Sequence, residues 1–247
     1  MPDTLGYRKR IGIVVPSTNT TVQPECEPMR PRGVTNHIAR STIRERPLNS
    51  EQAFMEHMQA MREGIGAAID QVMTSEPDHL IMGVALETFW GGVDQAAKLQ
   101  DELSRRASVG VSMGSTAAQA ALEAFGAKKI AVLTPHQQRG DDMVQLYLAQ
   151  AGFEVVRLKG LKCVSPRAIA QVSLDVVRSS FRELDGHDVD ALLQVGTALP
   201  AVAAAAEAER WLDKPVLAVN AVTYWDALRR CGIEDRVYGL GRILEEF

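Results

Sequence analysis

The chain has 247 residues and a formal net charge of −4, with 46% hydrophobic and 23% charged residues. This length and composition allow one large domain or two small ones around a substantial core. The acidic balance, with no basic stripe among aromatic residues, argues against nucleic-acid binding, and the apolar runs are too short to cross a bilayer. Three scattered cysteines and an N-terminus without a secretory signal lead us to expect a cytoplasmic protein.

Short apolar runs alternate with helical patterns through the first part of the chain. Apolar residues recur at helical spacing after Ser50, a plausible helix cap, whereas the segment 17–33 looks irregular. We expect strands at 11–15, 34–43, 80–84 and 109–113, and helices at 50–74, 93–106 and 115–125.

The same order then starts again. We expect strands at 130–133, 154–158, 192–195 and 216–219. Helices are expected at 141–151, 165–184, 200–212 and 223–231, with a final helix at 237–247.

Matching segments indicate that the chain is a duplication. RKRIGIVVPS lines up with AKKIAVLTPH, proline on proline, and DHLIMGVALET lines up with DALLQVGTALP. We therefore predict an α/β fold of two similar four-stranded parallel-sheet halves related by a pseudo-two-fold axis. The first half would contain residues 1–114 and 223–247, and the second residues 115–222. Because the C-terminal ends of parallel strands share one edge of a sheet, a ligand would bind between the halves.

The run PSTNTT follows the first strand and is dense in hydroxyl and amide groups. Ser17 and Asn19 are the residues we expect to contact a ligand there, because such groups can hold a carboxylate at a helix start. Ordinary helix capping by the Ser and Thr residues is the alternative.

The turn GVALETFWGG follows the third strand. Gly83 would let the backbone approach a ligand closely. In an apolar pocket the pKa of Glu87 would rise, which makes it a candidate general acid or base. The alternative is a solvent-facing carboxylate near a helix start.

Two further turns come from the second half. In GTALP, Gly196 and Thr197 could offer backbone N–H groups to an oxyanion, or form a tight turn with a capping threonine. His136 matches Ser17 across the repeat, so it should point into the same cleft, although a lone histidine is more often structural. Motifs for NAD, ATP or metal binding are absent, and we expect neither a cofactor nor a metal.

Taken together, these motifs resemble the aspartate/glutamate racemase superfamily, in particular its maleate cis–trans isomerases and arylmalonate decarboxylases. PSTNTT is similar to the isomerase signature PSSNTT, and IMGVALETFWGG to the glycine turn of the decarboxylases. MGSTAAQAALEAFGAKKIAVLTPH and VNAVTYWDALRRCG also follow the family pattern. The resemblance covers nearly the whole chain and implies the fold described above.

Enzymes of this superfamily work through cysteines at the two strand ends. The resemblance places the first position on Gly83, or a neighbour up to Leu86, and the second on Gly196, so both family cysteines are replaced here. It also puts Val84 and Ala85 where decarboxylases have carboxylate-holding hydroxyl residues.

By the same comparison, His136 stands where the family usually has a tyrosine, while Asn19 is retained. We expect a cofactor-independent isomerase, decarboxylase or other lyase, or a hydrolase, acting on a small carboxylate or dicarboxylate. Glu87 or His136 would be the proton-transfer group, and the protein would be a homo-oligomer. The alternative is a non-catalytic protein that binds small carboxylates.

Overall fold

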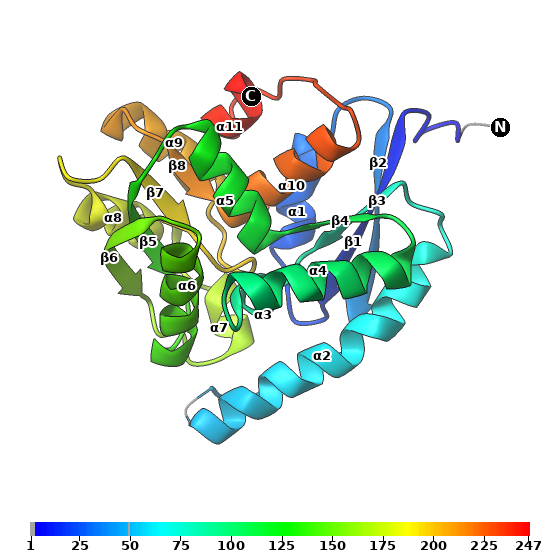
Figure 1. The fold of residues 1–247 in the computed structure, drawn as a ribbon, viewed down its shortest axis with the longest axis horizontal. Coiled ribbons are helices and arrows are strands. Elements are labelled where there is room, and N and C mark those ends of the chain that lie inside the picture. The colour runs from blue at the N-terminus through cyan, green and yellow to red at the C-terminus, as the bar shows by residue number, and fades with distance from the viewer. Residues whose placement is uncertain (1–2, 49) are drawn as a thin grey trace.

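Each half of the molecule is built on a four-stranded parallel sheet, as seen in a computed structural model that describes residues 3–48 and 50–247 (Figure 1). The first sheet has the order β2-β1-β3-β4 and contains β1 (Lys9–Pro16), β2 (Val34–Ser41), β3 (His79–Met82) and β4 (Gly110–Met113). The second has the order β6-β5-β7-β8 and contains β5 (Lys129–Thr134), β6 (Glu154–Gly160), β7 (Ala191–Gln194) and β8 (Val216–Ala218). The predicted fold class is therefore confirmed.

The two sheets also agree in detail. The Asp78 carboxylate accepts a hydrogen bond from the backbone N–H of Arg10 at 2.7 Å, and Asp190 accepts the equivalent bond from Lys129 at 2.7 Å. Each aspartate thus fixes the start of the central strand in its own sheet. The four residues are matched in the sequence repeat, which supports a duplication.

Helices cover both sheets. Those that follow strands of the first sheet are α1 (Val22–Cys26) with the short 3-10 helix η1 (Glu27–Met29), α2 (Glu51–Met73), α3 (Ala85–Phe89), α4 (Val93–Ala107) and α5 (Gly114–Ala124). Those that follow the second are α6 (Gln138–Gln150), α7 (Pro166–Ala170), α8 (Leu174–Leu184), α9 (Val202–Leu212), α10 (Val219–Arg230) and α11 (Arg242–Glu246). Helices α5 and α10 pack against each other between the sheets, while α2 runs along the lower edge of the molecule in Figure 1.

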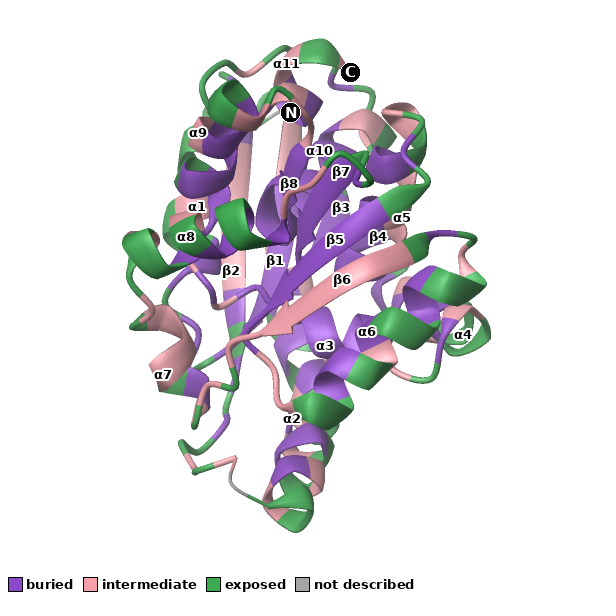
Figure 2. Cartoon of the chain, turned by 90° about the vertical axis from the view of Figure 1, so that its left-hand side faces the viewer, coloured by how far each residue is buried: buried purple, intermediate pink, exposed green. Residues whose placement is uncertain are grey.

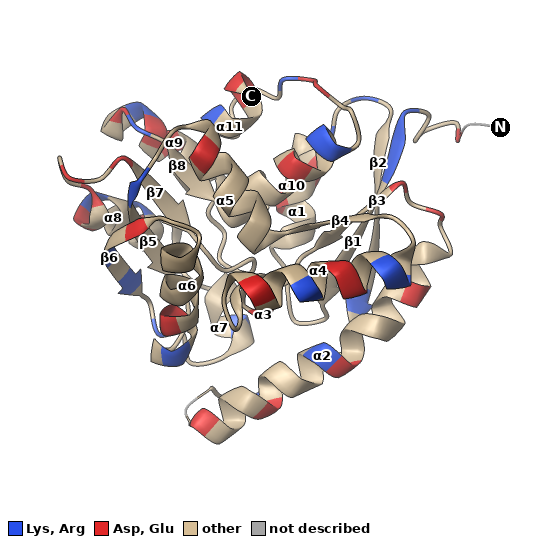
Figure 3. Cartoon of the chain, viewed as in Figure 1, with Lys and Arg blue, Asp and Glu red and all other residues tan. Residues whose placement is uncertain are grey.

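Burial explains the apolar runs that predicted the strands. The central strands β1, β3, β5 and β7 are almost entirely buried, as Figure 2 shows, whereas β6 is only partly covered. The Lys, Arg, Asp and Glu residues lie mainly on the outer helices and loops (Figure 3). No helix in the described ranges is both long and apolar enough to cross a membrane.

Several element boundaries differ from the sequence predictions. The helix expected at 165–184 is two helices, α7 and α8, because the Ser173 hydroxyl accepts a hydrogen bond from Val176 N and caps a new helix. The final helix is confined to Arg242–Glu246, since Gly239 and Gly241 adopt positive φ values of 84° and 117° just before it. The segment expected to be irregular contains α1 and η1. The domain boundaries stay a prediction.

Candidate active site

A cavity of about 90 Å³ lies where the C-terminal ends of the central strands of both halves face each other. This volume suits a molecule of roughly ten non-hydrogen atoms or fewer. The turns after β1, β3, β5 and β7 contribute Pro16, Thr18, Asn19, Val84, Ala85, Leu86, Pro135, His136, Gln137, Gly196, Thr197 and Ala198. Equivalent turns from the two halves therefore meet around one space, as the repeat predicted.

One end of the cavity is polar and joins the two halves. Asn19 donates from Nδ2 to the Thr197 hydroxyl at 3.2 Å, and that hydroxyl donates to the Gly83 carbonyl at 3.0 Å. The Asn19 Oδ1 atom accepts from the backbone N–H groups of Thr21 and Val22 at 2.9 and 3.0 Å. Because an amide nitrogen carries two N–H groups, Asn19 keeps one for a ligand.

Glycine is required at Gly196, at the end of β7. Its φ is +125°, and a Cβ there would lie 2.5 Å from the Pro135 Cδ atom. A side chain would therefore be strained in its backbone and would collide with the turn that leads to His136. Gly196 thus allows the turns after β5 and β7 to approach each other beside the cavity.

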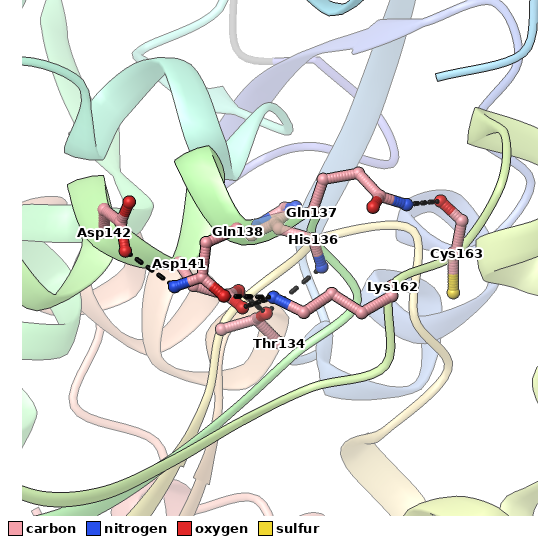
Figure 4. A network of polar contacts seen from close by, with 8 residues as sticks. All are labelled: Thr134, His136, Gln137, Gln138, Asp141, Asp142, Lys162 and Cys163. Carbon is pink, nitrogen blue, oxygen red and sulfur yellow. Dashed lines mark hydrogen bonds and ion pairs between the residues drawn. The ribbon is translucent and has the colours of Figure 1, made fainter. Parts of the chain in front are cut away.

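His136 lies in the turn after β5, which a buried network holds in place (Figure 4). The Thr134 hydroxyl accepts a hydrogen bond from His136 N at 3.1 Å and donates a short one to the Asp141 carboxylate. Lys162 donates to the other Asp141 oxygen at 2.5 Å. Burial raises the pKa of Asp141, and the bonds from Lys162 and Thr134 oppose that shift.

The imidazole of His136 has one nitrogen without a partner in the described part of the chain. His136 is partly exposed as a residue, but its Nε2 atom is buried and has no hydrogen-bond partner among residues 3–48 and 50–247. Burial and the nearby positive charge of Lys162 lower the pKa of His136 to about 4. The ring is therefore neutral at pH 7, with one nitrogen able to accept and the other able to donate a proton.

Three of the residues predicted to form the site do not line the cavity. Glu87 faces a separate groove between α2 and α4, where its Oε1 atom accepts a hydrogen bond from Arg62 Nε at 2.6 Å. Burial raises the pKa of Glu87, and Arg62 opposes the shift. Ser17 is exposed and its hydroxyl bonds to the backbone of Ile43, while Gly83 contributes only the carbonyl that Thr197 binds.

The wall of the cavity formed by α2 was not predicted from the sequence. The N-terminal part of α2 and the loop before it supply Leu48, Phe54, His57, Met58 and Met61, and the region of α7 supplies Cys163, Pro166 and Ile169. The spacing of Phe54, Met58 and Met61 had identified an apolar helix face, and His57 lies on that same face. A histidine within an apolar stripe was the signal available in the sequence.

The described lining of the cavity carries no Asp, Glu, Lys or Arg side chain. Burial raises the pKa of the Cys163 thiol, so this cysteine is a neutral thiol at pH 7. No group of histidine, cysteine and acidic residues suited to a metal ion occurs in the described ranges. The site therefore offers neutral hydrogen-bonding groups, at Asn19 and the histidines, within an apolar enclosure.

The fold and site define a class of duplicated α/β proteins with a mostly apolar cavity between the two halves. The sequence matches the arylmalonate decarboxylase family model over residues 11–244, and the chain belongs to that family. It is 24% identical to the maleate isomerase of Nocardia farcinica over 244 residues, which cover 96% of both chains. It is 26% identical to the maleate isomerase of Alcaligenes faecalis over 244 residues, covering 95% of this chain and 96% of the relative.

Solved structures show the same fold. The Nocardia farcinica maleate cis–trans isomerase bound to TRIS superposes with a TM-score of 0.87 at 22% identity, covering 96% of this chain and 98% of that one. A liganded arylmalonate decarboxylase variant superposes with a TM-score of 0.81 at 19% identity, covering 97% and 100% of the two chains. A cysteine-to-serine variant of the Nocardia isomerase contains a covalently bound succinylcysteine intermediate, at a TM-score of 0.87 and 23% identity over 97% of this chain and 99% of that one.

Proposed function

We propose that this protein is a cofactor-independent enzyme that acts on a small carboxylate or dicarboxylate in the cavity, with His136 as the proton-transfer group. The observation that carries the proposal is the position of His136 in the cavity wall, with its buried Nε2 atom lacking a partner in the described part of the chain. Membership of a family with enzymes of this kind supports an isomerase or decarboxylase/lyase reaction. The names of the family and its relatives give no support to hydrolysis, the other reaction that we expected from the sequence.

The polar end of the cavity would orient the substrate. The substrate carboxylate would accept hydrogen bonds from the second N–H of Asn19 Nδ2 and from the backbone N–H groups at the start of α3. No side chain caps that end of α3. The Thr197 hydroxyl already bonds on both sides, so its role would be to hold Asn19 and the Gly83 turn in place. Val84, Ala85 and Gly196 would shape the wall beside the reacting carbon.

A bound anion would change the proton affinity of His136. The carboxylate would place a negative charge in a site without charged side chains, and an opposite charge favours protonated imidazole. The pKa of His136 would therefore rise from its low value when substrate binds. The ring would move a proton to or from the carbon next to the carboxylate, while the developing negative charge is shared by the carboxylate oxygens.

This chemistry would need no cysteine at the strand ends. The residues there, Gly83 to Ala85 and Val195 to Thr197, include none, and Cys163 reaches the cavity from a different segment. The alternative is a protein that binds the same carboxylates without converting them. The named relatives are enzymes, and that favours catalysis.

A ligand screen followed by turnover measurements tests the proposal. The wild-type protein is screened by thermal shift against maleate, phenylmalonate and simple alkanoates, and hits are followed by proton NMR in D₂O, which detects conversion and deuterium uptake at carbon. His136→Gln should lower turnover by about 10²–10⁴-fold with little loss of binding. His187→Gln, which changes an exposed histidine, is the matched control.

Two results would contradict the proposal. Ligands that bind tightly and are recovered unchanged, without deuterium, would identify a binding protein. Full turnover in His136→Gln together with lost turnover in Glu87→Gln would transfer the proton-transfer role to Glu87.

A further inference from the structure

A second histidine lines the same cavity. His57 lies on α2, is 7% exposed, and borders the cavity among Phe54, Met58 and Met61. Its Nδ1 atom is buried and has no hydrogen-bond partner in the described part of the chain. The two histidines that carry a buried imidazole nitrogen without a partner within the described ranges, His57 and His136, thus line the same cavity.

An unpaired ring nitrogen in an apolar wall costs folding free energy unless something binds it. A leucine or methionine would fill the same position on the α2 stripe without that cost. The wall is also tied to the second half. Leu48 N donates to the Val164 carbonyl at 2.8 Å, and Glu51 forms an ion pair with Arg139 of α6. His57 is therefore held opposite the turns of the second half.

We propose that His57 is a substrate-binding residue that hydrogen-bonds an uncharged polar group of the substrate, a hydroxyl or a carbonyl. The inference rests on the proposed function, in which Asn19 binds the substrate carboxylate at the other polar position. It narrows the substrate to a small carboxylate that carries a second, uncharged polar group on an apolar body.

The charge of the site determines the choice of an uncharged group. Burial and Arg46 lower the pKa of His57, an effect that Glu45 opposes, so the ring is neutral at pH 7. The described cavity wall also lacks lysine and arginine. A second carboxylate would lose its hydration on binding without gaining a cationic partner, which costs free energy. A hydroxyl or carbonyl needs only one neutral hydrogen-bond partner.

Matched ligand pairs test the proposal on the whole protein. Titration calorimetry compares butyrate, valerate and hexanoate with the same acids bearing a hydroxyl on the terminal carbon, and with the dicarboxylates of equal length. The wild type should bind at least one hydroxy acid about tenfold more tightly than its parent alkanoate, and more tightly than the dicarboxylate.

Substitutions then assign the preference to His57. His57→Leu should remove the preference for the hydroxy acid while alkanoate binding is kept, and His57→Gln should restore part of it. His187→Leu, the same change at an exposed position outside the cavity, should keep the preference. The ring nitrogen signals of His57 in ¹⁵N NMR should shift with the hydroxy acid and not with the alkanoate.

The outcomes distinguish this inference from the function on which it rests. Equal binding of hydroxy acids and alkanoates by the wild type, or a preference that survives in His57→Leu, would overturn the role of His57 and leave carboxylate binding intact. Tighter binding of the dicarboxylates than of the hydroxy acids would contradict the proposal that the second polar group of the substrate is uncharged. Failure of every carboxylate to bind would overturn the proposed function and this inference with it.

Discussion

Whether a residue of the candidate site reaches the cavity depends on the short element that carries it. Asn19, His136 and Thr197 reach the cavity because each lies in the turn after a buried strand. The apolar runs of the sequence predict where these strands end. Glu87 lies only two residues beyond Ala85, yet the short helix α3 turns it to the other side, toward Arg62. A rotation of 100° per helical residue decides which side chain faces a cavity, and the sequence does not reveal where a helix of one turn begins.

The buried state of His136 predicts how stability depends on pH. Its pKa of about 4 lies below the value near 6.5 of an unfolded histidine, so the unfolded chain binds more protons between these values. Stability should be fully present above about pH 6.5 and fall as the pH drops toward 4. The contribution is at most about 3 kcal/mol. His79, with a pKa also lowered to about 4 by burial, adds to the same slope.

The measurement is urea unfolding at a series of pH values. His136→Gln should flatten part of the loss between about pH 6.5 and pH 4, whereas His187→Gln, at an exposed position, should follow the wild type. Identical slopes in the wild type and His136→Gln would contradict a neutral, buried His136.

Helices with a long apolar stripe were predicted well from the sequence. Helices whose formation depends on contacts with distant parts of the chain were predicted poorly. The 23-residue helix α2 was recognised from its apolar stripe, but nothing local indicated that its first turns close the cavity. The helix α1 was missed because its main partner is distant in the sequence. Glu25 of α1 accepts hydrogen bonds from Ala201 N and Val202 N at the start of α9, at 2.9 and 3.0 Å.

Glu25 acts as the cap of a helix in the other half. Its second carboxylate oxygen accepts a hydrogen bond from Asn220 at 2.7 Å. Burial raises the pKa of Glu25, and these hydrogen bonds oppose the shift. Glu25→Ala should lower the free energy of unfolding by about 2–4 kcal/mol, because it leaves the first N–H groups of α9 and one N–H of Asn220 without an acceptor. Asn220 would keep its other bond, to the Thr197 carbonyl at 3.0 Å.

Denaturant unfolding at neutral pH measures the effect. Glu27→Ala is the matched control in the next turn, since its carboxylate is exposed and bonds to Arg30 and Asn36. It should cost less than about 1 kcal/mol. Equal effects of the two substitutions would show that Glu25 does not connect the halves in solution.

The molecule as a whole follows the duplicated plan that the sequence predicted, including the register at the strand ends. Gly83 N donates to Val14 O at 2.7 Å, and Val195 N donates to Leu133 O at 2.9 Å, so Gly83 corresponds to Val195. The pairing of DHLIMGVALET with DALLQVGTALP predicts this correspondence and places Val84 on Gly196. The matched register supports a duplication, because a slip of one residue would turn every side chain to the other face of the sheet.

The equivalence of the two halves leads to a prediction about cooperativity. Asp78 binds the N–H of Arg10, and Asp190 binds the N–H groups of Lys128 and Lys129 at 2.9 and 2.7 Å. Either aspartate changed to alanine should lower the free energy of unfolding by about 1–2 kcal/mol. Because the two sites are in separate sheets, the double variant should lose the sum.

All three variants should nevertheless unfold in a single transition. The hydrogen bonds of Asn19 with Thr197 and of Glu25 with α9 join the two halves. If one half unfolded alone, these buried polar groups of the other half would lose their partners, so the halves should unfold together. Calorimetry and circular dichroism should give coincident transitions. Asp188→Ala, which removes only a surface ion pair with Arg157, should stay within about 1 kcal/mol of the wild type. Two separate transitions in Asp78→Ala or Asp190→Ala would mean that each half folds on its own and that the cavity forms only when the folded halves dock.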